Sequence, residues 1–352
     1  MRYTLLGRTG VRISEIALGT LTFGDDWKLP RATLAGILDR YAEAGGNVLD
    51  TANEYGRGSA ETTLGELLAG RRDEFVLTTK YTMQMRPGDP NSAGNHRKNL
   101  VASLDASLRR LGTDRVDLLW VHARDTLTPV PEVMRALDDQ VRAGKVLYVG
   151  VSDWPAWEVA QANTLAELRG WSAFAGLQIR YNLLERTPER ELLPMAHAFD
   201  LPVLAWGPLA DGRLTGKYLA GEPGRLDHVP WGEGRGPGDE IVEKVVRIAK
   251  EGGWSPAQVA LAWLRSRPGT VVPLIGATKE SQLVDNLAAC EVALDAAHLA
   301  ELEEASRVPV GFPHDFLRFP AMTDAIYGDR WRETDDRRTT VRRAVADDLF
   351  GG

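Results

Sequence analysis

Short apolar runs alternate with longer amphipathic stretches from near the start of the chain to about residue 290. The runs are rich in Val, Ile and Leu, and their length and composition are typical of buried β-strands. The sequence therefore predicts eight strands, at Ile16–Thr20, Asn47–Asp50, Phe75–Lys80, Val116–His122, Val146–Val151, Leu177–Asn182, Val203–Trp206 and Val271–Ile275.

The stretches between these runs place apolar residues at the spacing of one helix face. Strands that alternate with helices build a parallel sheet with helices packed against it. Eight such repeats indicate closure into a barrel, so the expected fold class is α/β, a (β/α)8 (TIM) barrel. The predicted helices are Arg31–Ala44, Ser59–Ala69, Arg97–Leu111, Val130–Ala143, Ala156–Leu168, Glu240–Lys250 and Pro256–Arg265.

Three segments do not follow this repeat. Tyr3–Ile13, with Gly7-Arg-Thr-Gly10 at its centre, predicts a β-hairpin before the first barrel strand. The Gly- and Pro-rich stretch Gly221–Gly238 is typical of a mobile surface loop. Gly311–Gly352 mixes aromatic and charged residues without a clear period. We expect a single domain over residues 1–352, with a barrel core at about 14–306 and a C-terminal extension at about 307–352.

Composition narrows the class of protein. The chain has 352 residues, of which 43% are hydrophobic and 26% are charged, as in an ordinary globular enzyme. The net charge of −7 argues against binding to nucleic acid, which needs a basic surface. The single cysteine, Cys290, excludes a disulfide within the chain and a zinc site built on thiolates, and we expect no metal.

The sequence also contains no signal for membranes or secretion. The N-terminus lacks the apolar stretch of a signal peptide, and no run of about 20 apolar residues exists. We therefore expect a cytoplasmic protein that does not bind membranes. A homo-oligomer stays an open alternative.

Four ionisable residues lie at or just beyond the ends of adjacent predicted strands. Asp50, Lys80 and His122 end the second, third and fourth strands. Tyr55 lies in the loop after Asp50. Taken one at a time, each has a structural explanation, such as a turn cap, a loop aromatic or a buried histidine. Because the C-terminal ends of barrel strands meet at one face, we expect the four side chains to converge there.

This group of side chains suits proton transfer. A lysine ammonium next to a tyrosine favours the phenolate and so lowers the phenol pKa, while a neighbouring aspartate keeps the lysine charged. A histidine opposite them can donate a hydrogen bond to a substrate carbonyl. The group therefore favours delivery of a proton to an oxygen while a hydride reaches the attached carbon. It contains no nucleophile–base pair of the Ser–His type.

Three segments around these residues resemble the signature segments of the aldo-keto reductases, and the overall pattern is similar to bacterial members of that family. The segments are Val48-Leu-Asp-Thr-Ala-Asn-Glu-Tyr-Gly56, Leu77-Thr-Thr-Lys-Tyr81 and Leu118-Leu-Trp-Val-His122. The resemblance runs from the N-terminal hairpin to about Ala289, which is most of the chain.

The resemblance implies a barrel fold and a reversible, NADP(H)-dependent reduction of an aldehyde or ketone to an alcohol. It implies that Tyr55 is the general acid, that Lys80 and Asp50 tune it, and that His122 orients the substrate carbonyl. All four of these residues are present in the matching positions.

The cofactor segments agree with this resemblance. No Gly-x-Gly-x-x-Gly follows a predicted strand, so a Rossmann module is not indicated. Gly212-Arg-Leu-Thr-Gly-Lys217 has the wrong glycine spacing for a Walker loop, and Tyr218 replaces the required Ser or Thr. Aldo-keto reductases instead bind NADP(H) across the barrel mouth, and the matching positions are Ser152, Asp153, Gln178, Trp206, Gly207, Pro208, Leu209, Gly276, Thr278, Lys279, Gln282 and Asn286.

Two of these positions depart from the pattern of many members. Asp153 replaces an asparagine, and an ionised aspartate accepts hydrogen bonds but cannot donate them. Thr278 replaces an arginine that meets the 2′-phosphate of the cofactor, although Lys279 follows it. NADPH is the favoured cofactor, with NADH as the alternative.

The sequence says less about the identity of the substrate and about the position of the C-terminal segment. Trp27, Tyr81 and Trp154 are candidate aromatic walls of the substrate pocket. Gly311–Arg332 can border that pocket, pack outside the barrel or contact another subunit. Two other functions stay open: a regulatory subunit that binds NADPH with little turnover, and a non-redox enzyme that forms a Schiff base at Lys80. The cofactor segments argue against the second.

Overall fold

The structure is a computed structural model that describes residues 1–222, 224, 226, 237–328 and 330–333. Most of the expected surface loop at 221–238 lies outside these residues, as does the end of the C-terminal segment, 334–352.

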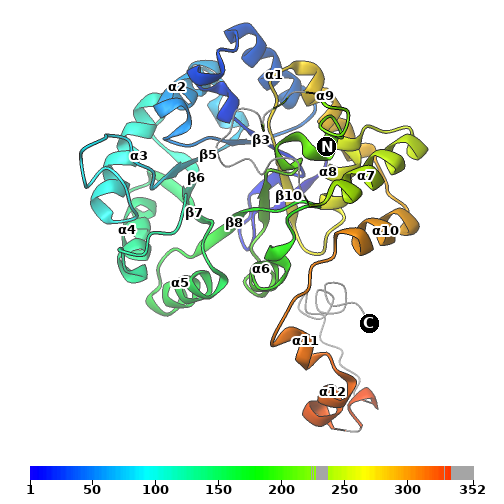
Figure 1. The fold of residues 1–352 in the computed structure, drawn as a ribbon. Helices are drawn as coiled ribbons and strands as arrows, with labels where there is room; N and C mark the ends of the chain where they lie inside the picture. The colour runs from blue at the N-terminus through cyan, green and yellow to red at the C-terminus, as the bar shows by residue number, and fades with distance from the viewer. Residues whose placement is uncertain (223, 225, 227–236, 329, 334–352) are drawn as a thin grey trace.

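Eight parallel strands close into a barrel (Figure 1), which confirms the predicted (β/α)8 fold. The last strand pairs with the first, through Leu274 opposite Ala17 and Ile275 opposite Leu18. All eight predicted strands are present, with the largest difference in β8, which begins at Phe174 and ends at Arg180. The strands are β3 (Ala17–Gly19), β4 (Val48–Asp50), β5 (Val76–Tyr81), β6 (Val116–Val121), β7 (Val146–Ser152), β8 (Phe174–Arg180), β9 (Val203–Trp206) and β10 (Val271–Ile275).

Helices surround the barrel and bury its outer face (Figure 1). None of the described helices is long and apolar enough to cross a membrane. The seven helices predicted from apolar spacing are present, and α6, α9 and α10 join them. The helices around the barrel are α1 (Arg31–Glu43), α2 (Ser59–Leu67), α3 (Arg97–Leu111), α4 (Val130–Arg142), α5 (Ala156–Arg169), α6 (Leu192–Ala198), α7 (Asp239–Gly252), α8 (Pro256–Arg265), α9 (Glu280–Ala288) and α10 (Ala296–Ser306).

The two faces of each strand pack against different parts of the molecule. Successive side chains of a strand point to opposite sides, so alternate residues enter the barrel and the others meet the helices. On β9, Leu204 and Trp206 pack with the interior cluster, while Val203 and Ala205 pack with the helices. This parity decides which strand-end residues can reach the mouth of the barrel.

Trp120 on β6 fills the interior. Its indole is fully buried, and its Nε1 donates a hydrogen bond to Thr78 Oγ1 at 3.0 Å. The neighbouring strands make room for the ring with glycines. A Cβ added at Gly150 would stand 2.4 Å from Trp120 Cε3, and one at Gly176 would stand 3.1 Å from Cη2. The large ring therefore requires small residues on β7 and β8.

The predicted N-terminal hairpin is confirmed and closes the other end of the barrel. Strands β1 (Tyr3–Leu5) and β2 (Arg12–Ser14) pair antiparallel, with Thr4 opposite Ile13. Ile13 and Leu6 are buried in the interior cluster. The apolar interior is thus sealed on the face opposite the mouth.

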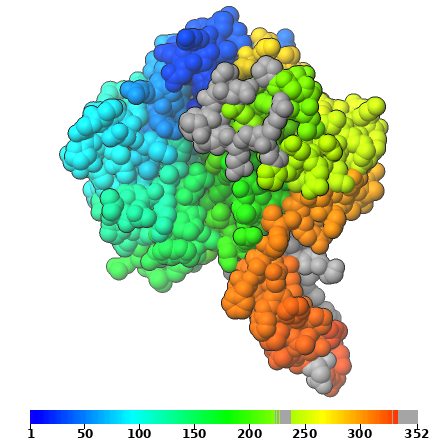
Figure 2. Space-filling view, viewed as in Figure 1, coloured from blue at the N-terminus to red at the C-terminus, as the bar shows by residue number. Residues whose placement is uncertain are grey.

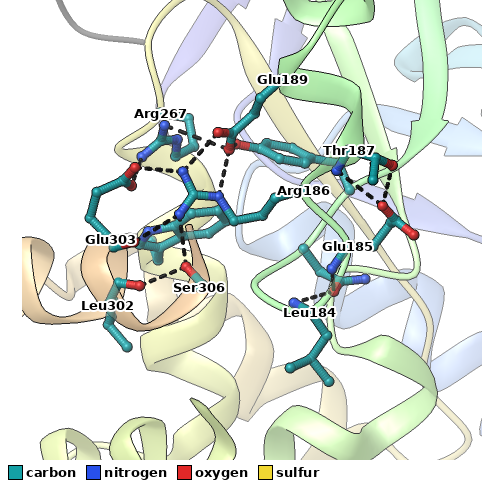
Figure 3. A network of polar contacts seen from close by, with 12 residues as sticks. Leu184, Glu185, Arg186, Thr187, Glu189, Arg267, Leu302, Glu303 and Ser306 are labelled. Carbon is teal, nitrogen blue, oxygen red and sulfur yellow. Dashed lines mark hydrogen bonds and ion pairs between the residues drawn. The ribbon is translucent and has the colours of Figure 1, made fainter. Parts of the chain in front are cut away.

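A buried ionic cluster fastens α10 to the barrel (Figure 3). The guanidinium of Arg186 is 1% exposed and donates to both oxygens of Glu189, at 2.7 and 2.8 Å. It also donates to Glu303 Oε1 at 2.6 Å and to Ser306 Oγ at 2.8 Å, both on α10. Arg267 donates to the other oxygen of Glu303 at 2.7 Å. Each charge has an opposite partner, which is the condition for burying charged groups at acceptable cost.

Beyond α10 the chain forms an arm that points away from the barrel (Figures 1 and 2). It contains α11 (His314–Leu317) and α12 (Pro320–Tyr327), and neither helix has a buried residue. The arm meets the barrel through His314, which lies 2.9 Å from Glu191. The described part of this segment therefore lies outside the barrel.

We predict that Gly150→Ala will destabilise the protein by about 1–3 kcal/mol, because the added methyl group overpacks the interior against the fixed Trp120 ring. Urea denaturation of the variant and the wild type measures the difference. Gly10→Ala is the matched control, since nothing lies within 4 Å of a Cβ at that position. Equal stability of the two variants would contradict the tight packing.

Candidate active site

A buried ion pair lies at the centre of the mouth. Lys80 Nζ donates to Asp50 Oδ2 at 2.5 Å, and both side chains are 0% exposed. Asp50 and Lys80 stand on the adjacent strands β4 and β5 at inward positions. Two opposite charges at this depth stabilise one another, whereas either one alone would be strongly destabilising.

Further hydrogen bonds fix both members of the pair. The other carboxylate oxygen of Asp50 accepts from Thr78 Oγ1 at 2.6 Å and from Gln178 Nε2 at 3.0 Å. Lys80 also donates to Thr51 O at 2.9 Å. Burial alone would lower the pKa of Lys80, but the neighbouring Asp50 outweighs it, and the net pKa is raised. The ammonium group is therefore held charged and immobile.

Tyr55 completes this group. Its hydroxyl lies 3.0 Å from Lys80 Nζ, at the start of the short 3-10 helix η3 (Tyr55–Gly58). The turn depends on Gly56, which has a φ of 55° and whose Cβ would stand 2.9 Å from Gly24 Cα. The chain therefore places Tyr55 next to the lysine through a loop that only glycine can form.

The pKa of Tyr55 differs from the expected direction. Burial raises it, and the opposing effect of Lys80 is smaller, so the net pKa is raised. The expectation of a lowered value was wrong because it counted the nearby cation and not the loss of water. At neutral pH the phenol keeps its proton.

His122 lies opposite Tyr55, just beyond β6. The two rings meet edge to face, with centroids 6.1 Å apart. Burial, followed by the charge of Lys80, holds the pKa of His122 well below its ordinary value. The imidazole is therefore neutral at neutral pH, and its buried Nδ1 has no hydrogen-bond partner among the described residues. A neutral ring can donate from one nitrogen to a carbonyl oxygen.

A second group of predicted residues lies at the ends of β7 to β9. Ser152, Gln178 and Trp206 occupy inward positions of these neighbouring strands. Asp153 follows Ser152 with a φ of 52°, and its Oδ1 accepts from Trp206 Nε1 at 3.1 Å. Asp153 is exposed at the rim. The protein around its carboxyl nevertheless displaces water, and this desolvation raises the pKa of Asp153 to about 6. The departure from asparagine thus keeps the acceptor for Trp206 and adds a titratable charge at the rim.

The remaining predicted cofactor residues lie after β9 and β10. Gly207, Pro208 and Leu209 connect β9 to the 3-10 helix η6 (Ala210–Thr215). After Gly276, Thr278 donates from its backbone N and its Oγ1 to Gln282 Oε1, at 2.9 and 3.0 Å. Lys279 precedes α9, and Asn286 lies one turn beyond Gln282 on the same helix face.

Two of the three candidate pocket walls, Tyr81 and Trp154, lie in the outer core cluster between strands and helices. Tyr81 follows Lys80 and therefore faces outward, where its hydroxyl donates to Asn95 O at 3.3 Å. Trp154 is buried in the outer cluster, edge to face with Phe174 at 6.0 Å. Both were chosen for their nearness to a strand end, and the side they face excludes them from the mouth. Trp27 lies half-buried in the loop after β3.

Several mouth residues were missed at the level of sequence. Thr78 and Arg180 share the inward parity of Lys80 and Gln178, and this alternation could have identified them. Asn53 is fully buried, and its side-chain amide has no hydrogen-bond partner among the described residues. Nothing in the local sequence distinguishes Asn53 from an ordinary turn residue.

The mouth offers open backbone near two glycines and, among the described residues, no ligand set for a metal ion. The described residues contain no cluster of three or more His, Cys, Asp or Glu that could hold a metal ion. Among the described residues, nothing lies within 4 Å of a Cβ added at Gly276, and a Cβ at Gly207 would meet only the Arg180 stem, at 3.9 Å. The first turn of α9 adds backbone N–H groups, which favour phosphate.

Comparison with known proteins agrees with this geometry. The profile of the Aldo/keto reductase family matches residues 15–307. The chain belongs to this family. Members of the family use nicotinamide cofactors in general, and reduction of a carbonyl is the activity that the match supports.

Similar proteins come from fungi. A norsolorinic acid reductase of Aspergillus flavus is 39% identical over 329 residues, which is 89% of this chain and 83% of the relative. The norsolorinic acid reductase stcV of Emericella nidulans is 40% identical, over 88% of this chain and 82% of its own. A putative aryl-alcohol dehydrogenase of Saccharomyces cerevisiae is 35% identical, over 92% of both chains. These fungal relatives give no support to the expected likeness to bacterial members.

We predict that Asp153→Asn will raise the melting temperature at pH 7.5 and that the gain will shrink toward pH 4.5. The folded-state pKa of about 6 exceeds the ordinary value of 3.8, so stability from this group is lost as the pH rises through 6. Asparagine still accepts from Trp206 but carries no charge. Thermal unfolding across this pH range measures the difference, and a gain that grows at low pH would refute it.

Proposed function

We propose that the protein is an NADPH-dependent reductase that reversibly converts an aldehyde or ketone to an alcohol, with Tyr55 as the general acid. The observation that carries the proposal is the line of contacts from Asp50 through Lys80 to the Tyr55 hydroxyl, which faces the neutral His122. This arrangement offers one movable proton and one hydrogen-bond donor to the same substrate oxygen.

The nicotinamide cofactor, when bound, supplies the hydride that the carbonyl carbon receives. Tyr55 gives its hydroxyl proton to the carbonyl oxygen as negative charge develops there. His122, being neutral, donates a hydrogen bond to the same oxygen and orients it. Lys80 stabilises the phenolate that Tyr55 becomes, since its ammonium lies 3.0 Å from that oxygen.

The buried lysine also accounts for reversibility. In the reduction, the raised pKa of Tyr55 keeps the proton available. In the oxidation, a phenolate must accept a proton from the alcohol, and Lys80 lowers the cost of forming it. Asp50 stays in place as the counter-ion, because three donors from Lys80, Thr78 and Gln178 hold its two oxygens.

The remaining mouth residues supply the proposed cofactor site. Ser152, Asp153 and Gln178 would hold the carboxamide, and Trp206 would stack on the nicotinamide ring. The backbone at Gly207, Pro208 and Leu209 would follow the dinucleotide, and the adenosine end would meet Gly276, Thr278, Lys279, Gln282 and Asn286. We propose NADPH over NADH because Lys279 adds a cation beside Thr278 at the start of α9.

The relatives suggest where to look for a substrate. One is named an aryl-alcohol dehydrogenase and others are named norsolorinic acid reductases. We therefore propose aryl aldehydes and aryl ketones as the first class to assay.

The direct test is titration of the purified protein with NADPH and with NADH, followed by an aryl carbonyl panel while the absorbance of the reduced nicotinamide is recorded. Tighter NADPH binding with substrate-dependent oxidation is the expected result. Binding without oxidation would favour a regulatory subunit instead, and failure to bind either cofactor would refute the proposal.

We predict that Tyr55→Phe will lower kcat roughly 10²-fold or more, because a positioned proton donor is lost. The Kd for NADPH should stay within about twofold, since the ring keeps its packing against His122. Steady-state kinetics and calorimetry measure the two quantities. A variant that kept most of its turnover would show that another group delivers the proton.

We predict that Gln282→Ala will raise the Kd for NADPH about tenfold while changing kcat little, because Gln282 orders Thr278 at the start of α9. Ser281→Ala, an exposed neighbour on the same helix, is the matched control and should bind like the wild type. Equal affinity in both variants would remove Gln282 from the cofactor site.

A further inference from the structure

Arg180 is a cation at the mouth to which the proposed mechanism gives no role. It ends β8, two residues after Gln178, and so has the same inward parity. Its side chain is 29% exposed, and its guanidinium carbon lies 5.7 Å from the centre of the Trp206 ring. The residue therefore lies beside the proposed nicotinamide site and remains accessible.

The hydrogen-bonding capacity of Arg180 is largely unused. Its Nε is buried without a partner among the described residues. The nearest carboxylate among the described residues is that of Asp211, whose Oδ2 stands 3.8 Å from the guanidinium, beyond hydrogen-bond distance. Arg186, equally part of this barrel, donates to three different side chains. A guanidinium has five donors, and leaving a buried one unpaired is costly, so Arg180 is poised for an acceptor from outside the chain.

The topology shows which side of the mouth this acceptor occupies. Going around the barrel, β8 is separated from β4 by three strands in either direction. Arg180 therefore lies across the mouth from Tyr55, which follows β4. It shares its side with Trp206 and Gly207, and within the described part of the chain a Cβ at Gly207 would meet only the Arg180 stem, at 3.9 Å. The space above Gly207 is thus lined by a cation and open backbone.

We infer that Arg180 binds an anionic oxygen group of a ligand at the mouth. A planar guanidinium with free donors recognises phosphate or carboxylate oxygens through paired, charge-assisted hydrogen bonds. The location beside Gly207 and away from Tyr55 favours a phosphate of the dinucleotide over a carboxylate or phenolate of the substrate. This inference rests on the proposed function, since it names a ligand group for the same mouth.

The test compares the wild type with Arg180→Met, which keeps an unbranched apolar stem, and with Arg180→Lys, which keeps the charge. Calorimetry gives the Kd for NADPH at low and moderate salt. We expect an increase of about tenfold or more in Arg180→Met, a smaller one in Arg180→Lys, and a weaker salt dependence in Arg180→Met. Arg142→Met, an exposed position on α4, controls for the change in net charge.

A second measurement separates the two sources of anion. The KM for 4-carboxybenzaldehyde is compared with that for its neutral methyl ester in all variants. If the Kd for NADPH is unchanged and only the KM for the carboxylate rises about tenfold, the anionic group that Arg180 binds is a carboxylate of the substrate. The inference of an anion site is then supported, and its ligand is the substrate instead of the cofactor.

Unchanged Kd and unchanged KM in both variants would overturn the inference, provided the wild type binds cofactor and turns over. Should Arg180→Met not fold, Arg180→Lys alone decides, because a shorter point charge cannot reproduce the guanidinium fork. A wild type that binds no cofactor would refute the proposed function instead, so the two failures are distinguishable.

Discussion

The pairing of Lys80 with Asp50 is the constraint on which the mouth of this barrel depends. Both groups are removed from water as completely as the apolar core, and only their contact makes that burial tolerable. Trp120 supports the pair from below, since it holds Thr78, and Thr78 in turn holds Asp50. Core packing and the buried ion pair thus share the same strands.

This pairing divides the mouth into two sides with different electrostatics. On the side of β4 to β6, the charge of Lys80 is balanced by Asp50 and removed from water, which suits the proton transfer proposed for Tyr55. On the side of β7 to β10, Asp153 and Arg180 remain accessible and only loosely paired. The proposed transfer of a hydride and a proton to adjacent atoms would draw on both environments within one opening.

Much of this arrangement could be predicted from sequence because it follows from short-range patterns. The strands were readable from apolar runs, and the convergence of Asp50, Tyr55, Lys80 and His122 from their positions at or just beyond strand ends. Tyr81 and Trp154 were misplaced because nearness to a strand end was used without asking which way each residue faces. The pKa of Tyr55 could not be predicted, since burial depends on loops from distant parts of the chain. Arg186 shows the same limit, because its partners Glu303 and Ser306 lie on a helix far along the sequence.

The N-terminal hairpin has a practical consequence for handling the protein. Its turn packs at Gly7 against Asp200 and Pro202, just ahead of β9, and Tyr3 donates to Gly45 O, just ahead of β4. The chain therefore starts on the closed end of the barrel. A tether attached through that end, for an electrode or a sensor chip, would leave the mouth facing the bulk solution. Diffusion of small molecules to the anchored protein would then be unobstructed by the support.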